Sequence, residues 1–504
     1  MNENIYAMLE RGFPENRDAP FLILPDGKQY SYQEMEQETA RYANLLVASG
    51  LQQGDRVAVQ VDKSAAAICL YLGCVRAGFA YVPISPDCQR DDVEYFLCNA
   101  DATLFVCRPG FLEADEKLTW STAAKTVFTL GTDGSGSLIE AAHAQPGSFV
   151  TAHCGPDELA AIMYTSGTTG RSKGAMLSHR NLSSNALVLH AYWGFIAGDV
   201  ILHMLPIYHT HGLFVATHCA MLNGSPLLFE PKFDTKRALQ LMAQATVFMG
   251  VPPHYAALLN EAGLNLATCG HMRLFISGSA PLLPSTFKEF RRRTGHTILE
   301  RYGMTEGGML VSNPWKGERR CGTVGFPLPG TRARVVSEQG RPVDEDQIGH
   351  IQVKGPNLFS GYWRMPEKTR EEFCIDGFFK TGDVGRVDAE GYLSIVGRFK
   401  DVITVGQQEV YPKEIETAID LMPGVAESAV IGLPDPLTGA KITAVVARKV
   451  AGPHLSAEDI TSALTTSFAD FKVPKAVHFV DQLPRNGMGK VQKNVLRERY
   501  QYPA

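Results

Sequence analysis

Two glycine-rich turns that end on a lysine lie far apart in this chain. The first reads Tyr164-Thr-Ser-Gly-Thr-Thr-Gly-Arg-Ser-Lys173, and the second reads Pro484-Arg-Asn-Gly-Met-Gly-Lys490. Backbone N–H groups of such a turn can surround phosphate oxygens, and the lysine adds positive charge. In a fold that brought both turns to one nucleotide, two separate parts of the protein would contact its negative charge. The pattern therefore predicts a two-part enzyme that acts on ATP.

Read one at a time, these residues leave alternatives open. The first turn is not a Walker A loop, because that motif has glycine immediately before its lysine and Ser172 stands there. A loop of serine, threonine and glycine is also a common surface turn. Glu306 suits Mg²⁺, which takes oxygen ligands, but it could equally be a solvated acid. Asp383 follows a glycine and could be a turn residue, while His209 could be a packed or surface histidine.

The composition is that of an ordinary globular enzyme. The chain has 504 residues, 45% of them hydrophobic and 20% charged, and its length predicts two or more domains. The net charge of −5, without a lysine or arginine run, argues against nucleic acid or an anionic membrane as a partner. The ten cysteines form no C-x-x-C pair, no apolar stretch is long enough for a membrane, and the N-terminus does not read as an export signal. We therefore expect a cytoplasmic location.

Helices and strands are predicted to alternate, which indicates a layered α/β architecture. Ser31 and Glu34 form a capping box that opens a helix ended by Gly50, and Ala65 to Arg76 is predicted to be helical between two strands. Beyond Lys400, a compact α+β unit is expected, including a helix from Ser456 to Phe471. The prediction is a large N-terminal α/β domain over residues 1–399 and a small domain over 400–504.

The full string from Tyr164 to Gly174 resembles the signature of the acyl-adenylate-forming superfamily, which includes acyl-CoA synthetases, adenylation domains and luciferases. Further blocks follow in the order of that family: Leu205-Pro-Ile-Tyr-His-Thr-His-Gly212, Ser277-Gly-Ser-Ala-Pro281, Tyr302-Gly-Met-Thr-Glu306, Gly361-Tyr-Trp363, Thr381-Gly-Asp383, Gly397-Arg398 and Lys490. The resemblance covers nearly the whole chain and is strongest to bacterial malonyl-CoA synthetases around His209, Arg301 and Lys490.

The resemblance implies a two-step reaction. A carboxylate attacks the α-phosphate of ATP, the mobile small domain rotates about a hinge at Lys400, and CoA attacks the acyl carbon; Lys400 could also be an ordinary exposed linker lysine. Catalytic roles fall to Lys490, His209, Thr165 and Glu306, with Glu306 as the Mg²⁺ ligand. Tyr302 resembles the aromatic residue that stacks on adenine, and Asp383 and Arg398 resemble the ribose-binding pair. The implied nucleotide-binding set is Thr165, Ser166, Gly167, Thr168, Thr169, Gly170, Lys173, Ser279, Ala280, Pro281, Tyr302, Gly303, Met304, Thr305, Asp383 and Arg398.

Arg301 carries the prediction of substrate. Many relatives that take plain acyl chains have a small residue just before the Tyr-Gly block, whereas an arginine offers a planar fork to a second carboxylate. An apolar tail would leave that charge buried and unpaired. With His209 and Ser277 at the same carboxylate pocket, Arg301 points to a short dicarboxylate; an outward-facing salt bridge is the alternative.

One hairpin departs from the family pattern. In the family, this hairpin lines the CoA tunnel. Relatives usually have a glycine at the position of Gln407, directly after the position of Gly406. Glu409 replaces an asparagine, glutamine or arginine. Both changes predict a slower second step.

The sequence as a whole predicts an ATP- and Mg²⁺-dependent malonate–CoA ligase. A ligase for methylmalonate or acetate is the first alternative, and a non-catalytic adenylate or acyl-CoA binding protein is the second. The context of Lys490 also resembles a target of a lysine acetyltransferase and deacetylase, which would switch the enzyme off.

Overall fold

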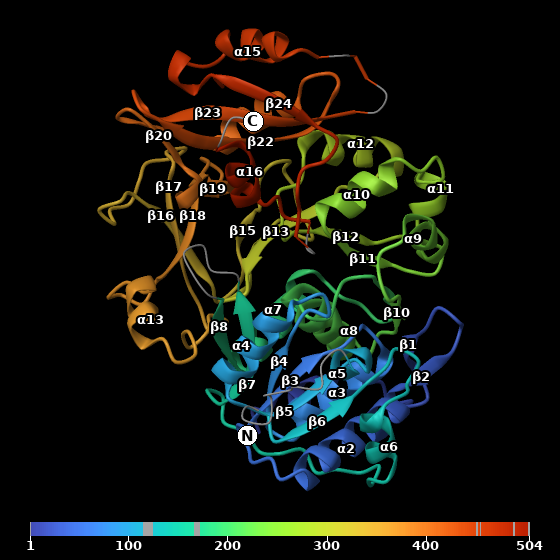
Figure 1. The fold of residues 1–504 in the computed structure, drawn as a ribbon. Helices are drawn as coiled ribbons and strands as arrows, with labels where there is room; N and C mark the ends of the chain where they lie inside the picture. Colours follow the sequence, from blue (N-terminus) through green and yellow to red (C-terminus); the bar gives the residue numbers. More distant parts are fainter. Residues whose placement is uncertain are drawn as a thin grey trace.

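The computed structural model describes residues 2–113, 124–165, 172–449, 452–453, 455–486 and 489–501. The polypeptide forms a large part that contains two sheets with helices, a β-rich part beside it, and a small C-terminal part at the top of Figure 1. The prediction of a large α/β domain followed by a small α+β domain is confirmed at the level of fold class. The division at residue 400 stays a prediction.

The first sheet has six strands in the order β6-β5-β3-β4-β7-β8. All neighbours run parallel except β7 and β8. Its strands are β3 (Arg56–Gln60), β4 (Ala80–Pro83), β5 (Ala102–Cys107), β6 (Thr126–Thr129), β7 (Leu159–Thr165) and β8 (Lys173–Ser178). The helices that accompany it in the chain are α2 (Tyr32–Ala48), α3 (Ala65–Arg76), α4 (Arg90–Ala100), α5 (Gly110–Glu113) and α6 (Ser137–His143).

The second sheet has nine strands in the order β15-β14-β13-β12-β11-β9-β10-β1-β2. They are β1 (Pro20–Ile23), β2 (Gln29–Ser31), β9 (Ile201–His203), β10 (Leu227–Phe229), β11 (Val247–Gly250), β12 (Leu274–Ser277), β13 (Leu299–Met304), β14 (Gly308–Ser312) and β15 (Phe326–Pro327). Its helices are α1 (Ile5–Leu9), α7 (His179–Tyr192), α8 (Thr217–Asn223), α9 (Thr235–Met242), α10 (Pro252–Leu259), α11 (Leu266–Cys269) and α12 (Pro284–Thr294).

Four antiparallel strands form the β-rich part: β16 (Arg332–Val336), β17 (Gly349–Lys354), β18 (Phe379–Val387) and β19 (Leu393–Arg398), with α13 (Pro366–Glu372) between them in the chain. The C-terminal part holds the hairpin β20 (Ile403–Val405) and β21 (Gln408–Val410), the sheet of β22 (Val425–Asp435), β23 (Gly439–Arg448) and β24 (Ala476–Val480), and α14 (Pro412–Asp420), α15 (Ala457–Thr465) and α16 (Lys493–Tyr500). Two hydrophobic clusters there contain only residues after 402, so this part has its own core.

Each large sheet has a topological switch point, a strand on whose two opposite sides the chain adds the following strands. In the first sheet the chain adds β4 on one side of β3 and β5 on the other, and in the second it adds β10 and β11 on opposite sides of β9. In parallel sheets, ligands bind outside the carboxyl ends of the strands at such switch points. The topology therefore places a candidate site beyond the ends of β3 and β9.

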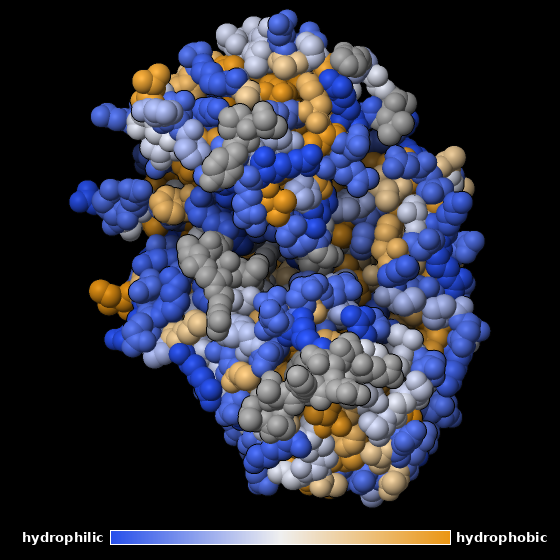
Figure 2. Space-filling model, in the orientation of Figure 1, coloured by the Kyte–Doolittle hydropathy of each residue, from blue (hydrophilic) through white to orange (hydrophobic). Residues whose placement is uncertain are grey.

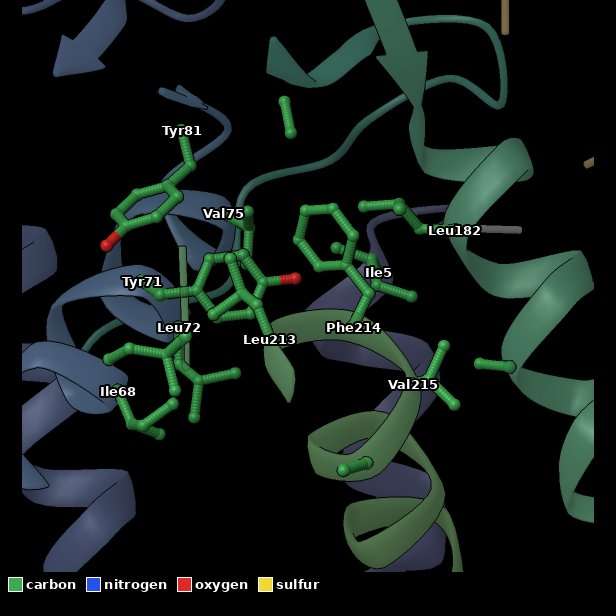
Figure 3. Close-up of a cluster of buried hydrophobic side chains, with 14 of the residues drawn as sticks. Ile5, Ile68, Tyr71, Leu72, Val75, Tyr81, Leu182, Leu213, Phe214 and Val215 are labelled. Atoms are coloured by element: carbon green, nitrogen blue, oxygen red, sulfur yellow. The ribbon is translucent and has the colours of Figure 1, made fainter. Parts of the chain in front are cut away.

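A short π-helix follows β9. This element, η3 (His211–Ala216), is buried along its whole length. Figure 3 shows Leu213, Phe214 and Val215 of η3 in a hydrophobic cluster with Tyr71 of α3 and Leu182 of α7. Single π-helical turns occur often at functional sites, because they shift the register of the residues that they carry.

The helix predicted to begin at the capping box of Ser31 and Glu34 is present in the structure. Both halves of the capping box are present at α2, and α3 has the predicted bounds. The helix expected from Ser456 to Phe471 is wrong in length, because α15 ends at Thr465. The Thr465 and Thr466 hydroxyls donate to the carbonyls of Thr461 and Ala463, and such side-chain bonds favour a helix end. None of the helices in the described part of the chain combines the length and apolarity that a bilayer crossing needs.

Candidate active site

Asp383 lies at the centre of a cluster that joins three parts of the fold. It is buried on β18, and its carboxylate accepts a hydrogen bond from Tyr302 Oη at 2.5 Å. Arg398 on β19 lies 2.9 Å away through Nε, because the register pairs residues 383 and 398 directly. Burial raises the pKa of Asp383, and the guanidinium of Arg398 opposes that rise. The predicted ribose pair therefore meets, with Tyr302 as a third member.

Lys490 reaches the same cluster from the C-terminal part. Its backbone N–H donates to Asn486 Oδ1 at 3.0 Å, which closes the turn. The turn rests on α10, where a Cβ on Gly489 would lie 2.7 Å from Cγ of Pro253. Solvent reaches Lys490, but the surrounding protein removes enough water to lower the pKa of its amine to about 8. Arg398 lowers that pKa further, and Asp383 opposes it.

Glu306 lies in a second group of polar residues near Lys173. Tyr362 Oη donates to Glu306 Oε1 at 2.9 Å. The Lys173 ammonium lies 4.1 Å from the centre of the Tyr362 ring and 3.9 Å from Glu372. Within the described ranges, no cluster of three or more histidine, cysteine or acidic residues could hold a metal alone. That fits Mg²⁺ in a nucleotide site, where one or two carboxylates suffice and phosphates supply other ligands.

Four polar side chains at the opposite end of the site lack partners. Arg301 is 3% exposed, and neither its Nε nor its Nη2 has a hydrogen-bond partner in the described part of the chain. The same holds, among the residues described, for both ring nitrogens of His211, for Nδ1 of His254 and for Oγ of Ser277. Buried polar groups in proteins are almost always paired, so this group is built to meet a ligand.

Glycine and charge both shape this pocket. A Cβ on Gly278 would lie 2.3 Å from Nη1 of Arg301, so only glycine lets the guanidinium lie against the strand end after β12. Burial lowers the pKa of Arg301 to about 9. Burial lowers the pKa of His211 as well, and the positive charge of Arg301 adds to the effect. Burial holds the pKa of His209 at about 4, so these histidines are neutral near pH 7.

The remaining predicted residues lie around this crevice or outside the described ranges. Thr165 ends β7, with its hydroxyl 3.4 Å from the carbonyl of Lys173, and the predicted loop residues Ser166, Gly167, Thr168, Thr169 and Gly170 lie outside the described residues. Ser279, with a positive φ of 71°, follows β12 with Ala280 and Pro281, and Gly303, Met304 and Thr305 lie at the end of β13. Lys400 is exposed in the short turn between β19 and β20, and Gly406, Gln407 and Glu409 lie at the β20–β21 hairpin.

Sequence reasoning missed His211, His254 and Tyr362 as site residues. His211 and Tyr362 stand inside motifs quoted above, but nothing in the sequence distinguishes a pocket histidine from a packed one. His254 stands outside every motif, stacked on Phe233 at 3.9 Å between ring centres. Only tertiary contacts reveal it, through its unpartnered nitrogen.

Figure 2 shows a largely hydrophilic face, hollowed where the C-terminal part meets the large part. Two family models match across these parts: the AMP-binding enzyme model matches residues 9–363, and the model of the AMP-binding enzyme C-terminal domain matches residues 414–490. The chain belongs to the AMP-binding enzymes. ATP-bound MatB from Rhodopseudomonas palustris superposes on this AMP-binding enzyme with a TM-score of 0.96, 51% identity and 99% coverage of each chain. The TM-score to apo MatB from the same organism is 0.86.

Curated relatives narrow the class of this AMP-binding enzyme. A malonate–CoA ligase of Arabidopsis thaliana is 31% identical over 522 residues, with coverage of 94% of this chain and 85% of the relative. A sulfoacetate–CoA ligase of Cupriavidus necator is 33% identical, with 94% coverage of both chains. The prediction of an AMP-forming acid–CoA ligase is confirmed at this level.

Lys490→Ala should lower adenylation by ~100- to 1000-fold, because one positive charge at a developing phosphate transition state contributes about that much. The measurement is ATP–pyrophosphate exchange with the acid present. Lys475→Ala is the matched control, since Lys475 is an exposed lysine of the same part that pairs only with Asp470 among the partners described. Normal exchange in Lys490→Ala would refute the assignment.

The pKa of about 8 for Lys490 predicts a pH profile. A lysine must be charged to stabilise the transition state, and this amine loses its proton as the pH rises through about 8. The kcat/KM for ATP, which reports groups of the free enzyme, should therefore fall above that pH. In Lys490→Arg the side chain stays charged, so this fall should disappear even if the rate is lower. An identical inflection in both proteins would assign it to another group.

Proposed function

We propose that this enzyme is a malonate–CoA ligase that converts malonate, ATP and CoA to malonyl-CoA, AMP and pyrophosphate. The observation that carries the proposal is the buried guanidinium of Arg301, whose Nε and Nη2 have no hydrogen-bond partner among the described residues. An isolated buried charge is expensive, so the pocket is complete only when a substrate brings an anion. The distal carboxylate of malonate supplies it, and the planar fork can bind both oxygens.

The neighbours of Arg301 favour a short acid over an apolar chain. His211, Ser277 and His254 all offer unpaired polar atoms, and an acyl tail would leave every one of them unsatisfied. Arg301 also directly precedes Tyr302 on β13, whose hydroxyl belongs to the Asp383 cluster, so the acid end and the ribose end share one strand. The named relatives agree, since malonate and sulfoacetate each carry a second anionic group.

In the first step, the free carboxylate of the acid attacks the α-phosphate and pyrophosphate leaves. His209 would face the attacking carboxylate as a neutral hydrogen-bonding group, because its pKa is about 4. Lys490 would neutralise charge on the α-phosphate, and Asp383 with Arg398 would hold the ribose. Thr165 and Lys173 would contact phosphate oxygens. Glu306, oriented by the Tyr362 hydroxyl, would hold Mg²⁺, which neutralises phosphate charge when bound.

In the second step, the CoA thiol attacks the acyl carbon and AMP leaves. We propose that the C-terminal part turns about Lys400 between the steps, so that Lys490 leaves and the β20–β21 hairpin arrives. We propose that the reaction runs in the cytoplasm, the location that the sequence predicts. The amine of Lys490 is open to solvent, and its acetylation by a lysine acetyltransferase would remove the charge that adenylation needs.

Arg301→Ala should lose malonate far more than propionate. Leaving a buried charge without its partner costs ~3–5 kcal/mol, or about 100- to 5000-fold, whereas propionate has no second charge to lose. The measurement is kcat/KM for malonate, methylmalonate, sulfoacetate, propionate and acetate in both proteins. Equal losses for malonate and propionate would assign Arg301 to the fold or the nucleotide. A wild type without acid-dependent pyrophosphate exchange would instead be the non-catalytic binding protein.

The hairpin prediction concerns the second step. Gln407 and Glu409 are exposed, and the partner described for Glu409 is a neutral hydroxyl, that of Tyr411 at 2.7 Å. The charge of Glu409 would repel CoA, and Gln407 fills space that glycine would leave free. The double variant Gln407→Gly and Glu409→Asn should raise the CoA-dependent rate or lower the KM for CoA, with pyrophosphate exchange unchanged. Single-turnover rates of the two half-reactions decide, and no gain in the variant would contradict the prediction.

A further inference from the structure

A partly buried lysine joins the two large sheets at their switch points. Lys63 follows β3, and its Nζ donates to Nδ1 and to the carbonyl oxygen of His203, each at 2.8 Å. His203 ends β9 and is 1% exposed. The ammonium also lies 4.3 Å from the centre of the Phe229 ring at the end of β10. The carboxyl ends of β3 and β9 are therefore held together by one side chain.

His203 passes this constraint to η3. Because Lys63 donates to Nδ1, the ring carries its proton on Nε2, which donates to the carbonyl of Gly212 at 2.9 Å. The Thr217 hydroxyl donates to the same oxygen at 3.0 Å. Only glycine fits at 212, since a Cβ there would lie 2.1 Å from the carbonyl oxygen of Pro206. Both acceptor positions of one carbonyl in η3 are thus occupied by side-chain donors.

The residue before Gly212 is His211, whose ring nitrogens are unpartnered in the described structure. The apolar side of η3 is fixed in the core through Leu213, Phe214 and Val215 (Figure 3). The hydrophobic core therefore fixes the apolar side of η3. The first residues of η3 are fixed instead by the polar contacts at the Gly212 carbonyl.

We propose that Lys63 and His203 are positioning residues for the acyl pocket: through the Gly212 carbonyl they hold η3 so that His211 stands beside Arg301 and the distal anion of the acid. The inference rests on the proposed function, because it assigns the pair to recognition of that anion. Neither residue contacts the substrate.

The choice of lysine supports a functional role over a purely structural one. Burial lowers the pKa of Lys63 well below its usual value, with Glu230 as an opposing charge, so the buried amine costs folding free energy. Glu230 is itself paired with Arg237 at 2.9 Å. A methionine of similar length would fill the same space without that cost. A methionine, however, could not donate to Nδ1 of His203, and that donation selects the tautomer whose Nε2–H reaches the carbonyl of Gly212.

The test compares substrates within each variant. Lys63→Met and His203→Leu should each raise the KM for malonate by roughly tenfold, the usual effect of losing an orienting partner behind a ligand-binding side chain. The KM for propionate and for ATP should change little, and the double variant should be no worse than the worse single one. His203→Gln retains a donor and an acceptor and should recover part of the malonate affinity.

Tyr71→Phe is the matched control. It removes another buried hydrogen bond to a histidine, that from Tyr71 Oη to His218 at 2.7 Å, and keeps the ring that packs against Phe214. It should lower Tm without changing the ratio of malonate to propionate KM. If Lys63→Met does not fold, Thr217→Val, which removes the other donor to Gly212, takes its place with the same expectation.

Two results would overturn the proposal. Equal changes for malonate and propionate in these variants, with Arg301→Ala still selective, would make the pair structural and leave the proposed function intact. An Arg301→Ala variant that fails to discriminate between the two acids would overturn the proposed function and this inference together. A selective loss of malonate in the Lys63 and His203 variants, absent from Tyr71→Phe, would support it.

Discussion

The pocket around Arg301 depends on a buried positive charge that the protein leaves without a counterion among the described residues. Arg301 is held in place by sterics, since only a glycine at 278 admits its guanidinium. His211 beside it adds no second positive charge, because burial lowers the pKa of its imidazole and the charge of Arg301 lowers it further. The proposed specificity for a dicarboxylate therefore rests on polar atoms that no described protein group satisfies.

The cluster around Asp383, the proposed nucleotide end of the site, is organised on the opposite principle. Asp383, Tyr302 and Arg398 satisfy one another through short contacts, so this cluster is complete before any ligand arrives. Its residues come from β13, β18 and β19, and Lys490 arrives from the C-terminal part. One strand, β13, carries both Arg301 and Tyr302, so the two ends of the site share a rigid support. That arrangement suits a reaction in which two substrates must meet in line with little movement.

Family and fold class could be predicted from the sequence, because the motifs are long and their order is fixed along the chain. Helices with strong end signals, such as that opened by Ser31, were also predictable. The end of α15 was not, since its apolar pattern continues toward Phe471, whereas the hydroxyls of Thr465 and Thr466 bond to carbonyls of the last turn and weaken its continuation. Lys63, His203, His211 and His254 could not be predicted as a group. Each is a single polar residue whose meaning depends on partners more than forty positions away or on their absence.

The lowered pKa of Lys490 has a chemical consequence apart from the reaction itself. An amine reacts with acylating agents only in its neutral form. With a pKa of about 8, roughly a quarter of the Lys490 side chains are neutral at pH 7.5, against about one in a thousand for an ordinary lysine. Lys490 is exposed, so acylating agents in solution can reach it. The crowding that lowers the pKa of Lys490 therefore also makes its amine sensitive to acylation by activated acids in its surroundings.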